Sequence, residues 1–102
     1  INQKKAYGRY GRPWISLEGN LFLSALLRPQ CLAQDAEQIS IVAGIALAKT
    51  MREYLLDPEN LNIKAPNDIL LNGKKVAGIL IETELSQENT KLEWVVIGMG
   101  VN

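Results

Sequence analysis

The order of apolar and polar positions along the chain predicts one long helix. Residues 39–48 are apolar almost without interruption, and Asp35 is a residue type that often caps a helix start. The helix is expected to run to about Leu56 and to end before Pro58, which cannot continue it. Because this segment is apolar nearly all round, we expect it to be widely buried, against a sheet.

Shorter apolar segments between turn residues predict strands at 21–27, 61–64, 69–71, from 74 to about 85, and 92–102. The pair Asn72-Gly73 is a strong hairpin signal, because both residues tolerate positive φ. Residues 3–14 have no apolar period and are expected to form a loop. This order predicts an α+β fold, with a mostly antiparallel mixed sheet packed against one long helix.

Composition adds a charge asymmetry to this picture. The 102 residues suit one small domain, and 11 basic residues balance 11 acidic ones, so no bulk field favours nucleic acid or a membrane. Residues 1–30 nevertheless carry five basic residues and one acidic residue. A basic N-terminal third is suited to receive an anion, and a solvated basic surface is the alternative.

Missing residue types exclude several kinds of chemistry. The chain has no histidine, so serine–histidine and zinc–histidine sites within it are excluded. Cys31 is the single cysteine, which rules out an internal disulfide and favours a reducing, cytoplasmic location. Neither a signal peptide nor an apolar run of about 20 residues is found. Since the sequence starts inside a loop and stops at a strand end, we expect a piece of a larger domain.

The basic loop near the N-terminus carries the first candidate chemistry. Gly8 and Gly11 would let the backbone approach a ligand closely. Arg9 and Arg12 are suited to bidentate bonds with carboxylate or phosphate, and Trp14 to stacking on a planar ring. The alternative is a flexible surface turn with solvated arginines.

Two further candidates lie around the predicted hairpin. Asn67 and Asp68 would either bind a ligand or its metal ion, or bond only their own backbone as turn residues do. Lys75 and Gly78 are three apart, so an ideal strand points them to opposite faces unless a bulge realigns them. Together with Lys74, Lys75 is otherwise an exposed pair beside the turn.

The last strand carries the clearest ligand pattern. A period of two places Gly98, Gly100 and Asn102 on one face, where two positions without side chains form a trough closed by a carboxamide. The alternate residues are expected to face the core: Ile97, Met99 and Val101. Glycines weaken a purely structural strand, so the pattern favours a ligand site.

Four segments together resemble the catalytic domain of biotin protein ligases, in the biotin/lipoate ligase superfamily with its class II synthetase-like fold. The matching segments are GRYGRPW from Gly8, GNLFLSALLRP from Gly19, PNDILLNGKKVAGILIE from Pro66 and VVIGMGVN from Val95. The resemblance covers nearly the whole chain, 1–102, as a central part of that domain. It implies that biotin attacks ATP, with magnesium, to give biotinyl-5′-AMP, and that a lysine of a biotin carboxyl carrier domain then receives the biotin.

The resemblance also implies site residues. Lys75 and Arg9 would act catalytically. The biotin site would be formed by Gln3, Arg9, Lys75, Gly78, Gly98 and Gly100. The nucleotide would be bound by Arg12, Trp14, Asn67, Asp68 and Asn102. No dedicated protein metal site is expected.

The chain departs from the family at three positions: Ala6 replaces a loop glycine, Tyr7 an arginine, and Ala65 a tryptophan. These differences leave a second hypothesis open, a truncated non-catalytic remnant that at most binds biotin or a partner. Lipoate or octanoate transfer is a third, although the Lys75 hairpin and the arginine loop match the biotin branch more closely. The sequence contains no helix-turn-helix module, so nothing supports a repressor role.

Overall fold

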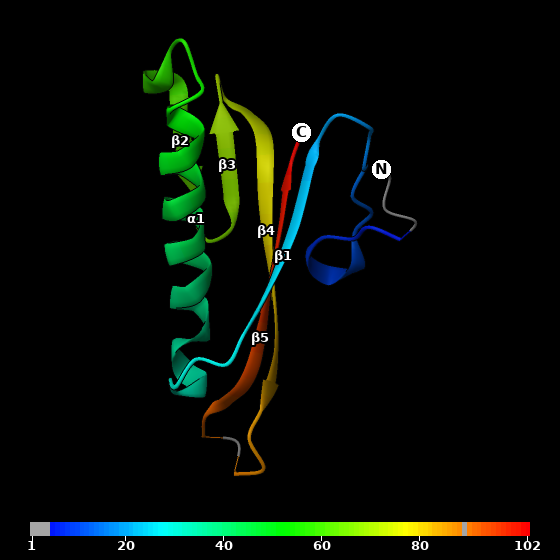
Figure 1. Ribbon diagram of the computed structural model, residues 1–102, viewed down its shortest axis with the longest axis vertical. Helices are drawn as coiled ribbons and strands as arrows, with labels where there is room; N and C mark the ends of the chain where they lie inside the picture. The colour runs from blue at the N-terminus through cyan, green and yellow to red at the C-terminus, as the bar shows by residue number, and fades with distance from the viewer. Residues whose placement is uncertain (1–4, 89) are drawn as a thin grey trace.

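The computed structural model describes residues 5–88 and 90–102. A single sheet separates the helix, on one face, from the N-terminal loop on the other (Figure 1). The main elements are β1 (Leu21–Leu27), α1 (Ala36–Arg52), β2 (Leu61–Lys64), β3 (Asp68–Leu71), β4 (Lys74–Leu85) and β5 (Leu92–Val101). The strand order is β1-β5-β4-β3-β2 and each neighbouring pair is antiparallel, which confirms the α+β prediction. Short 3-10 helices also form. Arg9–Gly11 lies within the N-terminal loop, Ala33–Asp35 leads into α1, and Pro58–Asn60 leads into β2.

The hairpin between β3 and β4 forms where the sequence predicts it. Asn72 and Gly73 have φ angles of 52° and 78°, the positive values that a tight two-residue turn requires. The register then shifts: Leu70 pairs with Lys75, but Ile69 pairs with Ala77. Residue 76 is therefore a bulge, an extra residue on β4 without a partner on β3.

The core lies between α1 and the sheet in two adjoining clusters. One contains Ala48, Leu61, Ile69 and Ala77, and the other contains Ile79, Leu92, Val95 and Ile97. Met99 and Val101 pack against these clusters, as expected for the core-facing side of β5. The helix presents small residues to the sheet, because its buried positions are Ser40, Gly44 and Ala48. Small side chains at a spacing of four let the helix approach the sheet closely.

The helix is shorter than the sequence predicts. It ends at Arg52 instead of continuing to about Leu56. After it, the N–H groups of Glu53, Tyr54 and Leu55 donate to carbonyls three residues back, so the chain tightens into turns. Asp35 does precede the helix, but its side chain makes no capping hydrogen bond.

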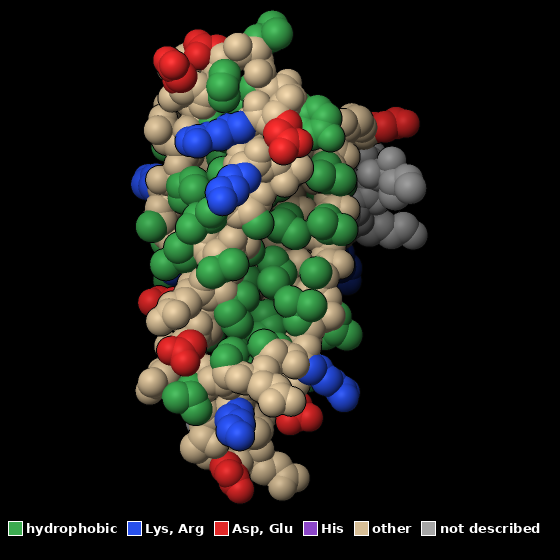
Figure 2. All heavy atoms as spheres, turned by 60° about the vertical axis from the view of Figure 1, so that its left-hand side comes forward, with side chains coloured by type: hydrophobic (Ala, Val, Ile, Leu, Met, Phe, Trp, Pro, Cys, Tyr) green, Lys and Arg blue, Asp and Glu red, His purple; other side chains and the backbone are tan. Residues whose placement is uncertain are grey.

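The expected wide burial of the helix is wrong for the described residues. Ile41, Val42 and Ile45 lie on the outer side of α1 and are exposed, Val42 to 65%. Figure 2 shows apolar side chains gathered on this side of the molecule. Only the stripe facing the sheet is buried, since no described segment packs on the opposite side. Among the described helices, none combines the length and apolar character needed to cross a membrane.

The helix–sheet contact predicts the effect of a substitution at Gly44. A Cβ added there would lie 3.6 Å from Ile79 Cδ1, an ordinary van der Waals contact. Gly44→Ala is therefore expected to raise the free energy of unfolding by about 0.5–1 kcal/mol, through better helix propensity. Urea denaturation measures the change. Gly73→Ala, at a φ of 78°, should instead destabilise the chain, and a destabilised Gly44→Ala would contradict the observed spacing.

Candidate functional site

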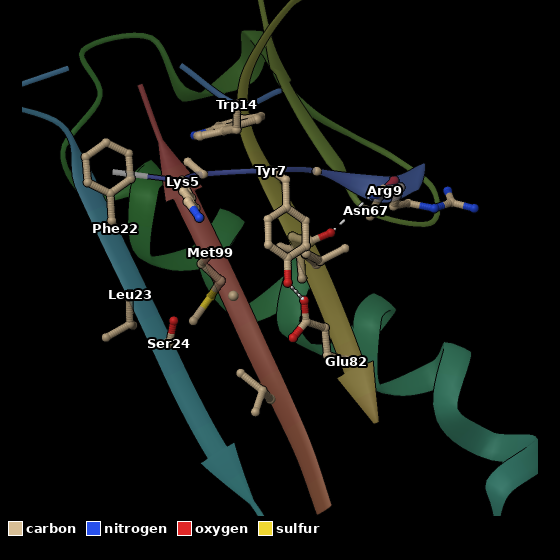
Figure 3. Close-up of a pocket in the computed structure, with 18 of the residues that line it drawn as sticks. Lys5, Tyr7, Arg9, Trp14, Phe22, Leu23, Ser24, Asn67, Glu82 and Met99 are labelled. Carbon is tan, nitrogen blue, oxygen red and sulfur yellow. Dashed lines mark hydrogen bonds between the residues drawn. The ribbon is translucent and has the colours of Figure 1, made fainter. Parts of the chain in front are cut away.

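A cavity lies on the face of the sheet opposite α1, beneath the N-terminal loop (Figure 3). Its volume is about 220 Å³. Alternate residues of three adjacent strands form its floor, since period two points them to the same face. These residues are Phe22 and Ser24 of β1, Gly98 and Gly100 of β5, and Gly78, Leu80 and Glu82 of β4.

Most of the site residues implied by the family resemblance meet at this cavity. Those lining it are Arg9, Trp14, Asn67, Lys75, Gly78, Gly98 and Gly100. Asp68 is joined to them through Lys75. Gln3 lies outside the described residues. The structure therefore brings together segments from the loop, from the β2–β3 turn and from the two central strands.

Two implied nucleotide residues lie outside this cavity. Arg12 does not line it, and its guanidinium group lies 5.8 Å from the centroid of the Tyr10 ring. Asn102 is not part of β5, which ends at Val101, so the expected strand end is one residue too long. Its Oδ1 accepts a hydrogen bond from Asn20 Nδ2 at 3.3 Å, and its N–H donates to the Val76 carbonyl. Asn102 therefore closes the sheet end, not the trough.

The bulge at residue 76 decides where Lys75 points. It places Asp68 opposite Gly78 and Leu70 opposite Lys75, so Lys75 shares a face with Gly78. Lys75 Nζ lies 2.8 Å from Asp68 Oδ1 and 5.2 Å from the centroid of the Trp14 ring. The lysine side chain is 43% exposed, so its ion pair with Asp68 is partly screened by solvent. This arrangement holds the ammonium group at the cavity while leaving it accessible to a ligand.

Trp14 fills one end of the trough. A Cβ added to Gly100 would lie 2.8 Å from Trp14 Nε1, and one added to Gly78 would lie 3.1 Å from Trp14 Cζ3. At Gly98 the nearest atom is Leu80 O at 3.6 Å, so this position is open. The two glycines of β5 are thus not equivalent: Gly100, with Gly78, seats the indole ring, and Gly98 leaves free floor. Trp14 Nε1 is buried and has no hydrogen-bond partner among residues 5–88 and 90–102.

Asn67 joins the β2–β3 turn to β4. Its Nδ2 donates to the Ile79 carbonyl at 3.1 Å, and its own carbonyl accepts from the Ile79 N–H at 2.9 Å. Asp68 belongs to β3, so it starts a strand and is not a turn residue. Asn67 therefore holds the turn against the sheet, and it also lines a second cavity of about 230 Å³ near the start of α1.

The loop is braced by its own backbone. The Gly8 N–H donates to the Arg12 carbonyl at 2.6 Å, and the Trp14 N–H donates to the Ala6 carbonyl at 3.2 Å. A turn at Arg9–Gly11 closes this small hairpin. The guanidinium of Arg9 lies 5.2 Å from the centroid of the Tyr10 ring, and Figure 3 shows the Arg9 side chain extending away from Tyr7.

Tyr7 and Glu82 form a pair that the sequence reasoning did not identify. The Tyr7 hydroxyl donates a hydrogen bond to Glu82 Oε1, and the two side chains meet at the cavity (Figure 3). This bond, with the repulsion between the carboxylate and a phenolate, raises the pKa of Tyr7 above its ordinary value. The alternation of Gly78, Leu80 and Glu82 along β4 was the available signal, because it places Glu82 on the ligand face.

Gly100 and Gly98 have different surroundings, so adding one methyl group at each position should have different effects. Gly100→Ala should displace Trp14 and cost about 1–3 kcal/mol of stability, because the added Cβ overlaps the indole ring. In a Trp94→Phe background, the fluorescence of Trp14 should then shift to longer wavelength. Gly98→Ala is the matched control and should leave the emission unchanged. Equal spectra for both variants would mean that the ring is not seated on Gly100.

The Tyr7–Glu82 bond predicts a titration at high pH. Only the protonated phenol donates, so the bond is present below the ordinary tyrosine pKa and is lost as pH rises through the raised pKa of Tyr7. Subtracting the tyrosinate absorbance of Tyr7→Phe from that of the wild type isolates this transition. Glu82→Gln should move it to lower pH, and an unmoved midpoint would show that the carboxylate does not hold the phenol.

Comparison with known proteins places this geometry in a family. The model of the biotin/lipoate A/B protein ligase family matches residues 2–102. A biotin–[acetyl-CoA-carboxylase] ligase of Paracoccus denitrificans is 44% identical over 95 residues, which are 93% of this chain and 39% of that protein. The bifunctional ligase/repressor BirA of Bacillus subtilis is 40% identical, over 98% of this chain and 30% of its own length.

A solved structure agrees with these sequence matches. The biotin protein ligase of Aquifex aeolicus in complex with biotin and ATP superposes with a TM-score of 0.76 at 34% identity, covering 99% of this chain and 39% of that one. The chain thus spans between 30% and 39% of the length of these three proteins. With its loop, bulged hairpin and glycine strand around one cavity, the chain belongs to the biotin/lipoate A/B protein ligase family, as part of a biotin protein ligase catalytic domain.

Proposed function

We propose that this chain forms the adenylation site of a ligase that activates biotin with ATP and transfers it to a carrier protein. One observation carries the proposal most directly: Lys75 lies beside Gly78, where a Cβ would be 3.3 Å from Lys75 Cε, and the same cavity holds the open floor at Gly98 together with Trp14 and Arg9. A cationic group next to a floor without side chains suits a flat ligand that ends in a carboxylate. The similar Aquifex aeolicus protein binds biotin and ATP.

In the first step, a carboxylate oxygen of biotin attacks the α-phosphorus of ATP. The bond between the α-phosphorus and the bridging oxygen breaks, and pyrophosphate leaves with that electron pair. Lys75 would stabilise the negative charge on the reacting oxygens, which is the main demand of this reaction. Arg9 would do the same after turning from its present contact with Tyr10 toward the cavity. The ion pair with Asp68 orients Lys75 before any ligand arrives, so less ordering is needed on binding.

The site offers further contacts for the adenylate. Trp14 Nε1 is a buried donor without an acceptor among the described residues, and leaving such a group unpaired costs about 1–3 kcal/mol. An oxygen of the ligand reaching this end of the cavity would satisfy it. Asn67 and Asp68 border the same end, so the nucleotide would extend toward the β2–β3 turn. Arg12 and Asn102 are exposed near this region and would reach the nucleotide only by changing their present contacts.

Magnesium fits this site only as an ion carried by the nucleotide. Among residues 5–88 and 90–102, no group of three or more acidic, cysteine or histidine side chains is arranged to hold a metal. Magnesium bound through phosphates needs one or two protein carboxylates. Glu82 lines the cavity but bonds Tyr7, whereas Asp68 borders it through Lys75, next to the proposed nucleotide end. When bound, the ion would supply charge neutralisation at the phosphates. Asp68 would then have to share its carboxylate between Lys75 and the metal.

In the second step, the amine of a carrier lysine attacks the acyl carbon of biotinyl-5′-AMP. The bond from that carbon to the phosphate oxygen breaks, AMP leaves, and an amide forms. A biotin carboxyl carrier domain is the proposed acceptor, consistent with the name of the Paracoccus denitrificans relative. A cytoplasmic location is part of the same proposal, and it rests on the single cysteine.

Binding and turnover of Lys75 and Lys74 variants test the proposal. Calorimetry with biotin and a non-hydrolysable ATP analogue should show binding to the wild type. Lys75→Ala should weaken it about ten- to hundred-fold, because a charge-assisted contact is lost. Lys74→Ala is the control: Lys74 is exposed in the same hairpin but does not line the cavity. Pyrophosphate release from ATP with biotin measures the chemical step.

The possible outcomes separate the hypotheses. Absence of binding to the wild type would overturn the proposed function. Binding without pyrophosphate release would support a non-catalytic remnant that retains the ligand pocket. Preferential release of pyrophosphate with lipoate or octanoate would favour the other branch of the superfamily.

A further inference from the structure

The loop over the cavity is attached to the sheet at two separate points. Trp14, at one end of the loop hairpin, lies on Gly78 and Gly100. Tyr7 faces Pro13 across the hairpin, where the two residues form an isolated β-bridge, and it bonds to Glu82. Since the hairpin is braced internally by backbone hydrogen bonds, it is expected to move largely as one unit.

The two attachment points lie at different positions along β4. Gly78 and Glu82 are four residues apart on the same face, which corresponds to about 13 Å along a strand. The cavity is lined by both residues and by Leu80 between them. Figure 3 shows Trp14 and Tyr7 reaching the strands at separate places, with the loop passing in front of the cavity. Holding both points keeps the loop over the ligand space.

The attachment at Tyr7 depends on its hydroxyl group. The Tyr7 side chain is 53% exposed, so burial of the ring does little to hold it in place. A phenol donating to a carboxylate makes a charge-assisted hydrogen bond, which is stronger than one between neutral groups. A phenol bonds Glu82 while adding no charge to the cavity.

We propose that Tyr7 and Glu82 form a latch that holds the loop over the cavity and slows the release of the ligand beneath it. Tyr7 is then a positioning residue, which acts through the loop and not on the reacting atoms. The effect on the loop stands alone, whereas the effect on ligand release rests on the proposed binding of biotin. Loss of the latch should speed dissociation and raise KM for biotin by a larger factor than it changes kcat, which reports the step at Lys75.

Hydrogen–deuterium exchange of the loop tests the latch without any ligand. In Tyr7→Phe, which keeps the ring and removes only the hydroxyl, the amides of residues 6–12 and 14 should exchange about three- to ten-fold faster, as expected from losing one hydrogen bond. Tyr54→Phe is the matched control, because Tyr54 is an exposed tyrosine at the far end of α1. It should leave loop exchange unchanged.

A double-mutant cycle shows whether the two residues act as a pair. Glu82→Gln keeps an oxygen that accepts from the phenol but removes the charge, so its effect on loop exchange should be intermediate. Combining Tyr7→Phe with Glu82→Gln should add little beyond Tyr7→Phe alone, since both changes break the same bond. Additive effects would show that Glu82 acts independently of Tyr7 and would overturn the latch.

Dissociation of biotin, followed by stopped-flow fluorescence of Trp14 in the Trp94→Phe background, completes the test in the full chain. Faster loop exchange together with several-fold faster dissociation in Tyr7→Phe supports the proposal. Unchanged loop exchange overturns it, whether or not biotin binds. Faster exchange with unchanged dissociation overturns its role in retention. If the wild type does not bind biotin, the proposed function fails, and so does the retention role, while the exchange data still decide whether the latch exists.

Discussion

A single extra residue on β4 determines how the candidate site is assembled. Without the bulge at residue 76, the alternation of the strand would send Lys75 toward α1 and away from Gly78. With it, Lys75 meets Asp68 from the neighbouring strand and lies over the Trp14 ring. The bulged residue Val76 and the following Ala77 both pack in the helix-side core. One local irregularity thus brings the charged group to the ligand face without disturbing the packing behind it.

The glycine positions show how the same residue type serves two purposes on one face. Gly78 and Gly100 lack side chains because the indole ring of Trp14 occupies that space. Gly98 lacks one over open cavity, where Leu80 is the nearest neighbour. The contact of Trp14 with Gly78 and Gly100 attaches the loop to the sheet, and the open floor at Gly98 leaves room for a ligand. Strands β4 and β5 therefore both hold the loop and leave space for a ligand beside it.

The sheet divides the molecule into a packing side and a ligand side. Helix α1 and the two apolar clusters lie on one side, while the loop, the cavity and its charged residues Lys75, Asp68 and Glu82 lie on the other. Along β4 and β5, successive side chains point alternately to the packing side and to the ligand side, so both sides are formed by the same two strands. The exposed outer side of α1, at Ile41, Val42 and Ile45, belongs to neither arrangement within the described residues. It is apolar surface that the described chain leaves uncovered.

The sequence by itself determined the strands, the Asn72-Gly73 turn and the core side of β5, because these depend on local periodicity and backbone preference. It also identified Lys75, Gly78, Gly98 and Trp14 as residues of interest. Only the tertiary structure decided which of them meet. The bulge, the seat of Trp14 on Gly100, the exposed side of α1 and the Tyr7–Glu82 bond all depend on contacts between segments far apart in the chain. Local alternation predicts the face of most strand side chains, but the bulge and long-range packing decide the face of Lys75 and which residues lie opposite one another.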